Sequence, residues 1–244
     1  ELNSLFSRLH DTFLRESRFA GDAAHEMKTP LAALKTYTQI ALNLEDIPAI
    51  HNNLEKVLQG VDRASHTVDQ LLILSRTMPD AHTKEHHRID FSKVITDTLA
   101  ALTPSALQKN IALSFEQNSD EPIFITGHNI SLSILIRNLV DNAIRYSDID
   151  TQVSVLLEQL PSTVKLIVID QGPGIDENQR KRIFERFFRV LGSKASGSGL
   201  GLNIVQQIAD LHQATIDLST GPSGKGLKFT ISFPLADHKS HASD

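Results

Sequence analysis

The stretch VKLIVIDQGPGI, residues 164–175, leads an apolar, strand-like run directly into Asp170 and a loop that contains Gly172 and Gly174. Glycine permits backbone angles and close approaches of a ligand that a side chain would prevent. An Asp at the end of a strand can accept a hydrogen bond from an exocyclic amine. Because Pro and Gly also mark ordinary turns, this stretch alone predicts a strand that ends either in a β-turn or at a nucleotide pocket.

Around this stretch, short strand-like runs are mixed with helical patterns. Apolar or alternating runs predict strands at residues 111–117, 153–159, 164–170 and 227–233. Helical periodicity predicts helices at residues 91–110, 131–147 and 201–214. Strands and helices in this order predict an α/β sandwich, in which helices cover one face of a mixed sheet.

A second glycine-rich loop, GSKASGSGLGLNIV at residues 192–205, runs directly into a helix. The backbone N–H groups and the dipole at the start of a helix favour a phosphate there. The loop is not a Walker A loop, because no Gly-Lys-Ser/Thr follows, and it is not the dinucleotide fingerprint in its usual position. A flexible linker is the alternative, and the apolar helix that begins at once argues against it.

The helix at residues 131–147 carries a polar row. Asn138 and Asn142 are four residues apart and therefore share one face, followed by Arg145 and Tyr146. An Asn oxygen suits Mg²⁺, Arg suits phosphate, and Tyr can flank an adenine. Taken alone, the row is better explained as the polar outer face of an amphipathic helix.

The first third of the chain has a purely helical pattern. Apolar or small residues recur every seven residues over residues 6–41, and alternating three-and-four spacing resumes over residues 50–71. This predicts two long helices, the second ending near Arg76. Such a hairpin has too narrow a core to stand alone, so two copies should form a four-helix bundle, a homodimer through about residues 10–78. The alternative is a monomeric hairpin that packs on the rest of the chain.

The stretch TMPDAHTKEHHR, residues 77–88, is polar, contains Pro79 and lacks periodicity, which predicts a linker. It holds His82, His86 and His87, and imidazoles at this spacing make a metal site conceivable. No acidic or thiolate ligand converges nearby, so a solvated linker is the favoured interpretation.

The composition excludes several functions. Of the 244 residues, 40% are apolar, enough for real cores, and the formal net charge of -5 gives no general attraction to nucleic acid. The chain has no Cys, which excludes disulfides and thiolate metal sites and suits a reducing, cytoplasmic compartment. No run of about 18 apolar residues occurs. Because residues 1–13 already have the pattern of an amphipathic helix, we expect a longer protein that continues before Glu1.

Taken together, these segments resemble the sensor histidine kinases of two-component systems, and among them the QseC/PmrB-type sensors that pair with OmpR-like regulators. Five motifs in the family's order and spacing carry the resemblance, over nearly the whole chain: FAGDAAHEMKTPLAAL at residues 19–34, NLVDNAIRYS at 138–147, DQGPGI at 170–175, FERFFR at 184–189 and GSGLGL at 197–202. The resemblance implies a multidomain α and α+β protein. Its parts are a helical hairpin that dimerises into a four-helix bundle and an α/β sandwich that binds ATP, of the gyrase/histidine-kinase type.

The first motif implies that His25 accepts a phosphate from ATP. Neutral imidazole is a competent nucleophile near pH 7, and an adjacent carboxylate, here Glu26, can orient it or accept its other proton. Thr29 lies one turn later, where the family orients water to dephosphorylate its partner, so the resemblance also implies a phosphatase activity. Pro30 cannot donate to the carbonyl of Glu26, so the helix is expected to bend there.

The other motifs imply a site for ATP and Mg²⁺. Asn142 resembles the metal ligand, Asn138 and Arg145 resemble contacts on the phosphate side, and Tyr146 resembles an adenine neighbour. Asp170 resembles the acceptor for the adenine amine. The remaining residues expected to contact the nucleotide are Gly172, Gly174, Ile175, Gly197, Ser198, Gly199, Leu200, Gly201 and Leu202.

The motif at residues 184–189 supplies two further catalytic candidates. The resemblance implies that Arg186 and Arg189 stabilise the charge of the transferring phosphoryl group. The phenylalanines of this motif are expected to anchor the glycine-rich loop by burial. Two features depart from the family pattern: Arg145 stands where Lys is frequent, which changes the geometry but keeps the charge, and the last glycine motif, at residues 221–234, fits only loosely.

The resemblance implies the following organisation: the end of a preceding signalling helix at residues 1–16, a dimerisation and phosphotransfer hairpin at 17–78, a linker at 79–87, a catalytic ATP-binding domain at 88–236 and a polar tail at 237–244. It also implies a homodimer, and an OmpR-like response regulator that receives the phosphate on an Asp. The chain is then the cytoplasmic portion of a sensor anchored in the inner membrane by segments before Glu1.

Two other classes share part of this pattern. ATPases of the gyrase, heat-shock and mismatch-repair type share the nucleotide motifs, but they place a Glu base at the position of Asn138 and lack a hairpin that carries a His. A non-catalytic phosphotransfer scaffold would keep the hairpin and lose the ATP residues. Asn138 and His25 argue against the first class, and the intact nucleotide motifs argue against the second.

Overall fold

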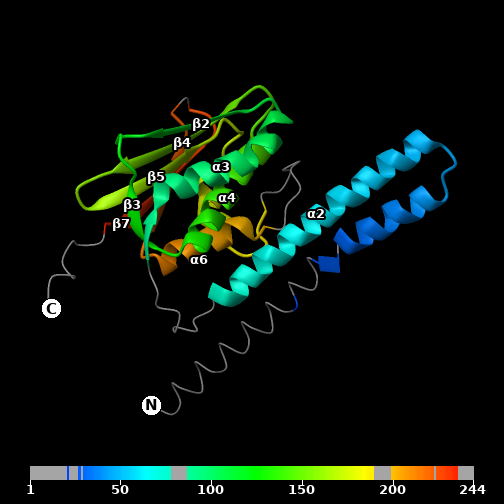
Figure 1. The fold of residues 1–244 in the computed structure, drawn as a ribbon, viewed down its shortest axis with the longest axis horizontal. Coiled ribbons are helices and arrows are strands. Elements are labelled where there is room, and N and C mark those ends of the chain that lie inside the picture. The colour runs from blue at the N-terminus through cyan, green and yellow to red at the C-terminus, as the bar shows by residue number, and fades with distance from the viewer. Residues whose placement is uncertain are drawn as a thin grey trace, which may run out of the picture. The chain divides into compact units, whose positions relative to one another are not determined.

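The computed structural model describes residues 21, 27–28, 30–77, 87–189, 199–222 and 224–235. The chain forms two compact units that divide between Ser75 and Arg76. Figure 1 shows a helical hairpin in the first unit and a layered α/β arrangement in the second. Among the described residues, no helix combines the length and the apolar character that crossing a bilayer requires.

The first unit contains a helical hairpin, as the helical patterns at residues 6–41 and 50–71 predict, although much of the first predicted helix falls outside the described residues. Residues 30–42 are helical, a short turn follows, and α2 (Ile47–Thr77) returns beside them (Figure 1). Asp46 caps α2, because its carboxylate accepts the N–H of Ala49 at 3.0 Å and its carbonyl accepts the N–H of Ile50. The hairpin expected from the sequence is therefore confirmed.

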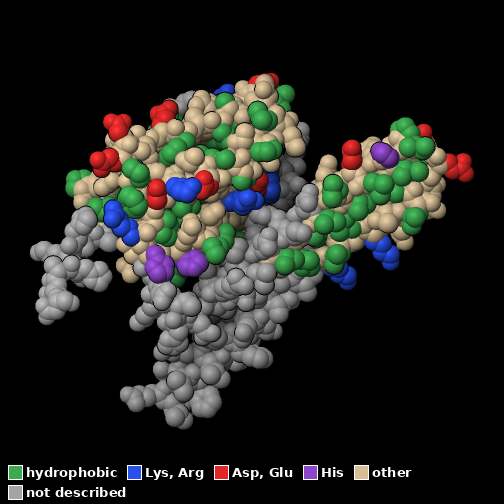
Figure 2. All heavy atoms as spheres, in the orientation of Figure 1, with side chains coloured by type: hydrophobic (Ala, Val, Ile, Leu, Met, Phe, Trp, Pro, Cys, Tyr) green, Lys and Arg blue, Asp and Glu red, His purple; other side chains and the backbone are tan. Residues whose placement is uncertain are grey.

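One face of α2 exposes a row of apolar side chains. Leu54, Leu58, Val61 and Val68 are 50, 64, 44 and 38% exposed, and their spacing of four, three and seven residues is that of a coiled-coil seam. Figure 2 shows the apolar side chains that run along the hairpin. A long seam of this kind is typical of a helix that packs against a partner.

The second unit is built on a five-stranded sheet. Its order is β2-β4-β5-β7-β6, and the strands are β2 (Ala112–Gln117), β4 (Gln152–Gln159), β5 (Thr163–Ile169), β7 (Leu227–Pro234) and β6 (Thr215–Thr220). The pair β2–β4 is parallel, and the other neighbours are antiparallel. Helices cover one face of this mixed sheet (Figure 1), namely α3 (Phe91–Leu107), α4 (Asn129–Tyr146) and α6 (Gly201–Leu211). The predicted α/β sandwich is confirmed.

Alternation along the strands explains why only one face is covered. In β4, Val153, Val155 and Leu157 are fully buried, while the intervening side chains are partly exposed. Period-two alternation places these three on the face toward the helices. The core between the layers is closed by an edge-to-face contact of Phe91 and Phe233, with ring centroids 5.2 Å apart.

Several elements have no counterpart in the sequence prediction. They are β1 (His87–Asp90) and β3 (Phe124–Gly127), which pair antiparallel, the strand β6, the short helix α5 (Glu177–Arg180) and the 3₁₀ turn η1 (Arg182–Phe184). Strands of four residues are too short to show a period. The edge strand β6 has no buried residue, so its pattern carries little hydrophobic signal.

Candidate nucleotide-binding site

Asp170 lies where β5 ends and is 7% exposed. Its Oδ1 accepts the N–H groups of Gly172 at 2.8 Å and of Leu227 at 3.1 Å. Burial raises the pKa of this carboxyl above its ordinary value, although the two N–H donors act in the opposite direction. Among the described residues, Oδ2 accepts no hydrogen bond, so the backbone fixes one oxygen and leaves the other for a donor from outside.

Two glycines allow this packing around Asp170. A Cβ on Gly172 would lie 2.9 Å from the carbonyl oxygen of Tyr146 and 3.1 Å from Asp170 Oδ1. Gly226 has φ +71°, and a Cβ there would lie 2.0 Å from the Asp170 carbonyl oxygen. Only glycine fits at either place. Gly226 comes from the last glycine motif, which fitted the family pattern only loosely, and it forms part of the frame of the site.

The start of α6 packs against the amides of α4. Asn138 is 4% exposed, and its Nδ2 donates to the Ile134 carbonyl at 2.9 Å. A Cβ on Gly201 would lie 2.8 Å from Asn138 Oδ1 and 3.6 Å from Asn142 Nδ2. The first turn of α6, with its backbone N–H groups, therefore lies directly beside this pair of amides.

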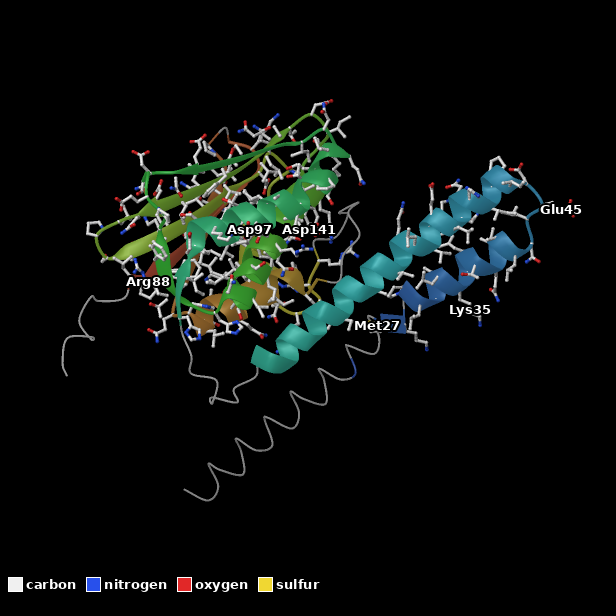
Figure 3. All side chains as sticks on the ribbon, viewed as in Figure 1. Met27, Lys35, Glu45, Arg88, Asp97 and Asp141 are labelled. Atoms are coloured by element: carbon white, nitrogen blue, oxygen red, sulfur yellow. The ribbon has the colours of Figure 1, made fainter. Side chains whose placement is uncertain are left out.

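The last turn of α4 carries the next two predicted residues. Arg145 Nη2 pairs with Asp141 Oδ2 at 2.6 Å, one turn back on α4, where Figure 3 labels Asp141. Tyr146 is the last residue of α4 and is 37% exposed, and its carbonyl oxygen faces Gly172. Tyr146 and Asp170 therefore lie on either side of one glycine.

The phenylalanine motif is attached to the second glycine motif. Phe187, with φ +61°, donates its N–H to the Gly199 carbonyl at 3.0 Å, and a Cβ on Gly199 would lie 2.7 Å from the Phe187 carbonyl carbon. Arg186 Nε donates to Asn203 Oδ1 at 3.3 Å, and Asn203 Nδ2 donates to the Phe184 carbonyl at 2.8 Å. Asn203 on α6, which the sequence analysis did not single out, thus orients Arg186.

The remaining predicted residues fall into two groups. Gly174 has φ +77°, Ile175 accepts a hydrogen bond from Arg180, Leu200 is fully buried, Leu202 is half-buried and Arg189 is exposed. The predictions for His25, Glu26, Thr29, Gly197, Ser198, His82 and His86 fall outside the described residues. Within the described ranges, no three His, Asp or Glu side chains converge as metal ligands.

A hollow of about 560 Å³ adjoins Asp170 through Gly172. Its lining consists of Asp148, Thr151, Gln171, Gly172, Pro173, Gly224 and Lys225. The sequence analysis did not single out Asp148 or Thr151, which lie outside its motifs, or Lys225, which lies within the last glycine motif. A buried acceptor, glycines that admit a flat ligand, two amides and a helix start are the groups that an adenine nucleotide requires.

Comparisons with known proteins agree with this geometry. The family model of histidine kinase-, DNA gyrase B- and HSP90-like ATPases matches residues 127–237. The model of the His Kinase A (phospho-acceptor) domain matches residues 15–78. The solved structure of the mycobacterial sensor histidine kinase MprB is 30% identical, with a TM-score of 0.55, over 62% of this chain and 97% of that chain. The chain belongs to the sensor histidine kinases.

Two curated relatives of this histidine kinase are sensor proteins as well. Sensor protein kinase PmrB of Pseudomonas aeruginosa is 38% identical over 235 residues, which are 96% of this chain and 49% of the relative. Sensor protein QseC of Salmonella typhimurium is 39% identical over 233 residues, 95% of this chain and 51% of the relative. The kinase chain thus spans about half the length of these relatives. The family predicted from the sequence motifs is confirmed, and the match to the ATPase model implies that this histidine kinase binds ATP.

Proposed function

We propose that this chain is the catalytic portion of a sensor that uses ATP to phosphorylate its own His25 and then passes the phosphate to an Asp of a response regulator. The observation that carries the proposal is that three elements contribute to one site. Asp170 follows the end of β5, Asn138 lies on α4, and Gly201 begins α6 beside Asn138. The same chain matches the phospho-acceptor domain over residues 15–78, which include His25.

In this proposal, separate groups of residues bind the adenine base, the metal ion and the phosphates. Asp170 Oδ2 accepts the exocyclic amine of adenine, and Tyr146 flanks the base across Gly172. Asn142 supplies an oxygen ligand to Mg²⁺, which neutralises phosphate charge when it is bound. Asn138, which lies next to the start of α6, and Arg145 contact the phosphates.

The transfer step is a displacement at phosphorus. An imidazole nitrogen of His25 forms a bond to the γ-phosphorus, the bond from that phosphorus to the bridging oxygen breaks, and ADP leaves. Glu26 accepts the proton that the imidazole loses. Arg186, oriented by Asn203, and Arg189 offset the negative charge of the transferring group.

The phosphate then moves from His25 to the carboxylate of a regulator, and the imidazole leaves. Thr29 orients a water that later hydrolyses the regulator's phosphate, which gives the kinase a second activity. We propose an OmpR-like regulator because the chain resembles the sensor proteins QseC and PmrB. The relatives are about twice as long as this chain, which supports a cytoplasmic portion of a sensor that is anchored in the inner membrane.

The hairpin is proposed as the dimerisation element, over residues 17–78. The seam on α2 supports this, because burying a leucine such as Leu54 or Leu58 against a second copy would contribute about 1.5–3 kcal/mol. The catalytic domain is proposed to run from residue 88 to 236, after a linker at 79–87. The division of the two units at Ser75 supports this organisation.

The test is incubation with γ-labelled ATP and Mg²⁺, followed by acid or base treatment of the protein. A phosphohistidine is lost in acid and survives base, so we expect acid-labile, base-stable label that is absent from His25→Gln. Phosphate release without labelled protein, unchanged in His25→Gln, would instead indicate an ATPase of the gyrase or heat-shock type. A chain that binds no nucleotide would indicate a phosphotransfer scaffold.

A further inference from the structure

A turn that follows α3 directs one lysine toward the end of α4. The helix α3 ends at Leu107, and Asn110 adopts a left-handed conformation with φ +54°. The N–H of Ile111 donates to the Ala106 carbonyl at 2.9 Å, which closes the turn. Lys109 lies within this turn and is half-buried.

The ammonium of Lys109 binds three backbone carbonyls at the end of α4. Nζ donates to the carbonyls of Ile144 at 3.0 Å, Arg145 at 2.7 Å and Ser147 at 3.2 Å. The last carbonyls of a helix have no partner within the helix and carry its negative dipole end. A cation from a different element therefore caps α4 and fixes where its last residue, Tyr146, lies.

The same two turns are joined a second time. The N–H of Asp150 donates to the Lys109 carbonyl at 3.3 Å, and Asn110 Nδ2 donates to Asp150 Oδ1. The N–H of Ala112 donates to the Thr151 carbonyl at 2.9 Å. These contacts hold the turn after α4, residues 147–151, against the turn after α3.

The capped end of α4 forms part of the adenine side of the site. The Tyr146 carbonyl faces Gly172, whose N–H donates to Asp170. Asp148 and Thr151 line the hollow beside Gly172. A continuous set of contacts thus leads from Lys109 through the end of α4 to Asp170.

Ser147 shows how tightly this corner is packed. Its N–H donates to the Ala143 carbonyl at 3.0 Å, its carbonyl accepts from Lys109, and the residue is 4% exposed. Its hydroxyl is buried and has no hydrogen-bond partner among the described residues. Lys109 holds the backbone of Ser147 in place. The Ser147 hydroxyl can therefore reach water only if the hydrogen bond from Lys109 to the Ser147 carbonyl breaks.

We propose that Lys109 is a positioning residue for nucleotide recognition, which caps α4 and thereby sets the distance and angle between Tyr146 and Asp170. The inference rests on the proposed function, since it concerns the same ATP site. Lys109 is not among the residues that line the hollow. Its loss should weaken every adenine nucleotide equally, because the base and not the phosphates is misplaced.

The chain offers a direct spectroscopic readout. It contains two tyrosines and no tryptophan, so in a Tyr37→Phe background Tyr146 is the only strong fluorophore. Titration with ADP gives both a dissociation constant and the change in Tyr146 emission at saturation. The test variant is Lys109→Met, which keeps the apolar stem. The control is Lys93→Met, which removes an exposed lysine that pairs with Asp97 on α3, labelled in Figure 3.

We expect Lys109→Met to weaken ADP and ATP about tenfold each, with a smaller change in Tyr146 emission at saturation, as loss of a partly buried helix cap implies. Lys109→Arg should recover part of the affinity, and Lys93→Met should bind as the unchanged chain does. Lys109→Gln, whose amide NH₂ group can still donate to the carbonyls, replaces Lys109→Met if that variant does not fold.

A purely structural lysine gives a different result. Lys109→Met would then lower the melting temperature, while ADP affinity well below that temperature stays within twofold and the Tyr146 signal is unchanged. That result would overturn the proposal for Lys109 and leave the proposed function intact. Failure of the unchanged chain to bind ADP would overturn the nucleotide site itself.

Discussion

Replacing Asp170 with Asn tests how the site selects its base. In Asp170→Asn only the amide oxygen can accept the N–H groups of Gly172 and Leu227, which donate at 2.8 and 3.1 Å in the unchanged chain. The amide nitrogen must therefore occupy the place of Oδ2. A donor then faces the exocyclic amine of adenine, which is also a donor.

The size of the effect follows from the lost hydrogen bond. A hydrogen bond to a charged group contributes about 1.5–3 kcal/mol, so ADP affinity should fall by about 10- to 150-fold. GDP has a carbonyl oxygen where ADP has the amine, so it should lose less, and the preference for ADP over GDP should shrink. Calorimetric titration with both nucleotides measures this, and Asp217→Asn, an exposed position on β6, is the matched control.

Although Asp170→Asn weakens ADP binding, it should not lower the stability of the folded chain. Burial raises the pKa of Asp170, so the folded chain holds this proton to higher pH than the unfolded chain, whose value is near 3.8. Between the two pKa values the folded state binds more protons, and stability therefore falls as the pH rises through this window. Asp170→Asn removes this loss of stability, so the variant should be at least as stable as the unchanged chain at pH 7.

The binding measurement decides the role of Asp170. If Asp170→Asn binds ADP within twofold of the unchanged chain and keeps the same base preference, the role of Asp170 is refuted.

Two further changes test the frame and the metal. Gly226→Ala and Gly224→Ala both place a side chain at φ near +70°, but only at Gly226 does the new Cβ meet a backbone atom, 2.0 Å away. In urea unfolding we expect Gly226→Ala to lose about 3 kcal/mol or more of unfolding free energy and Gly224→Ala to lose about 1 kcal/mol. Equal losses in the two variants would contradict the packing around Asp170. ATP should bind more tightly in Mg²⁺ than in EDTA, and Asn142→Ala should remove most of this difference while the affinity in EDTA changes less than about threefold. An undiminished effect of Mg²⁺ in this variant would exclude Asn142 as a ligand.

Much of the catalytic unit could be predicted from the sequence because its signals are local. Strand β5 is mostly apolar and ends just before Asp170, and the polar row of Asn138 and Asn142 has the spacing of one helix face. Gly172 comes two residues after Asp170, so a close approach at that turn could be expected from the sequence alone.

The features that were missed depend on contacts between distant segments. Gly226 is required by the carbonyl of Asp170, and Lys109 caps a helix that begins well after it in the sequence. No periodicity encodes either contact, because each depends on how β7 and α4 lie in the finished sheet and helix layer. Two weak signals were present: a glycine immediately before β7, and a lysine and an asparagine two and three residues after the end of α3.

The central claim is that ATP phosphorylates His25, and locating the phosphate tests it most directly. The chain is incubated with ATP and Mg²⁺, digested at a pH that preserves phosphohistidine, and its peptides are analysed by mass spectrometry. The account predicts one phosphate, on His25, that depends on ATP and disappears in Asp170→Asn at limiting ATP. Phosphate on another residue, or accumulation of ADP with no phosphopeptide, would contradict it.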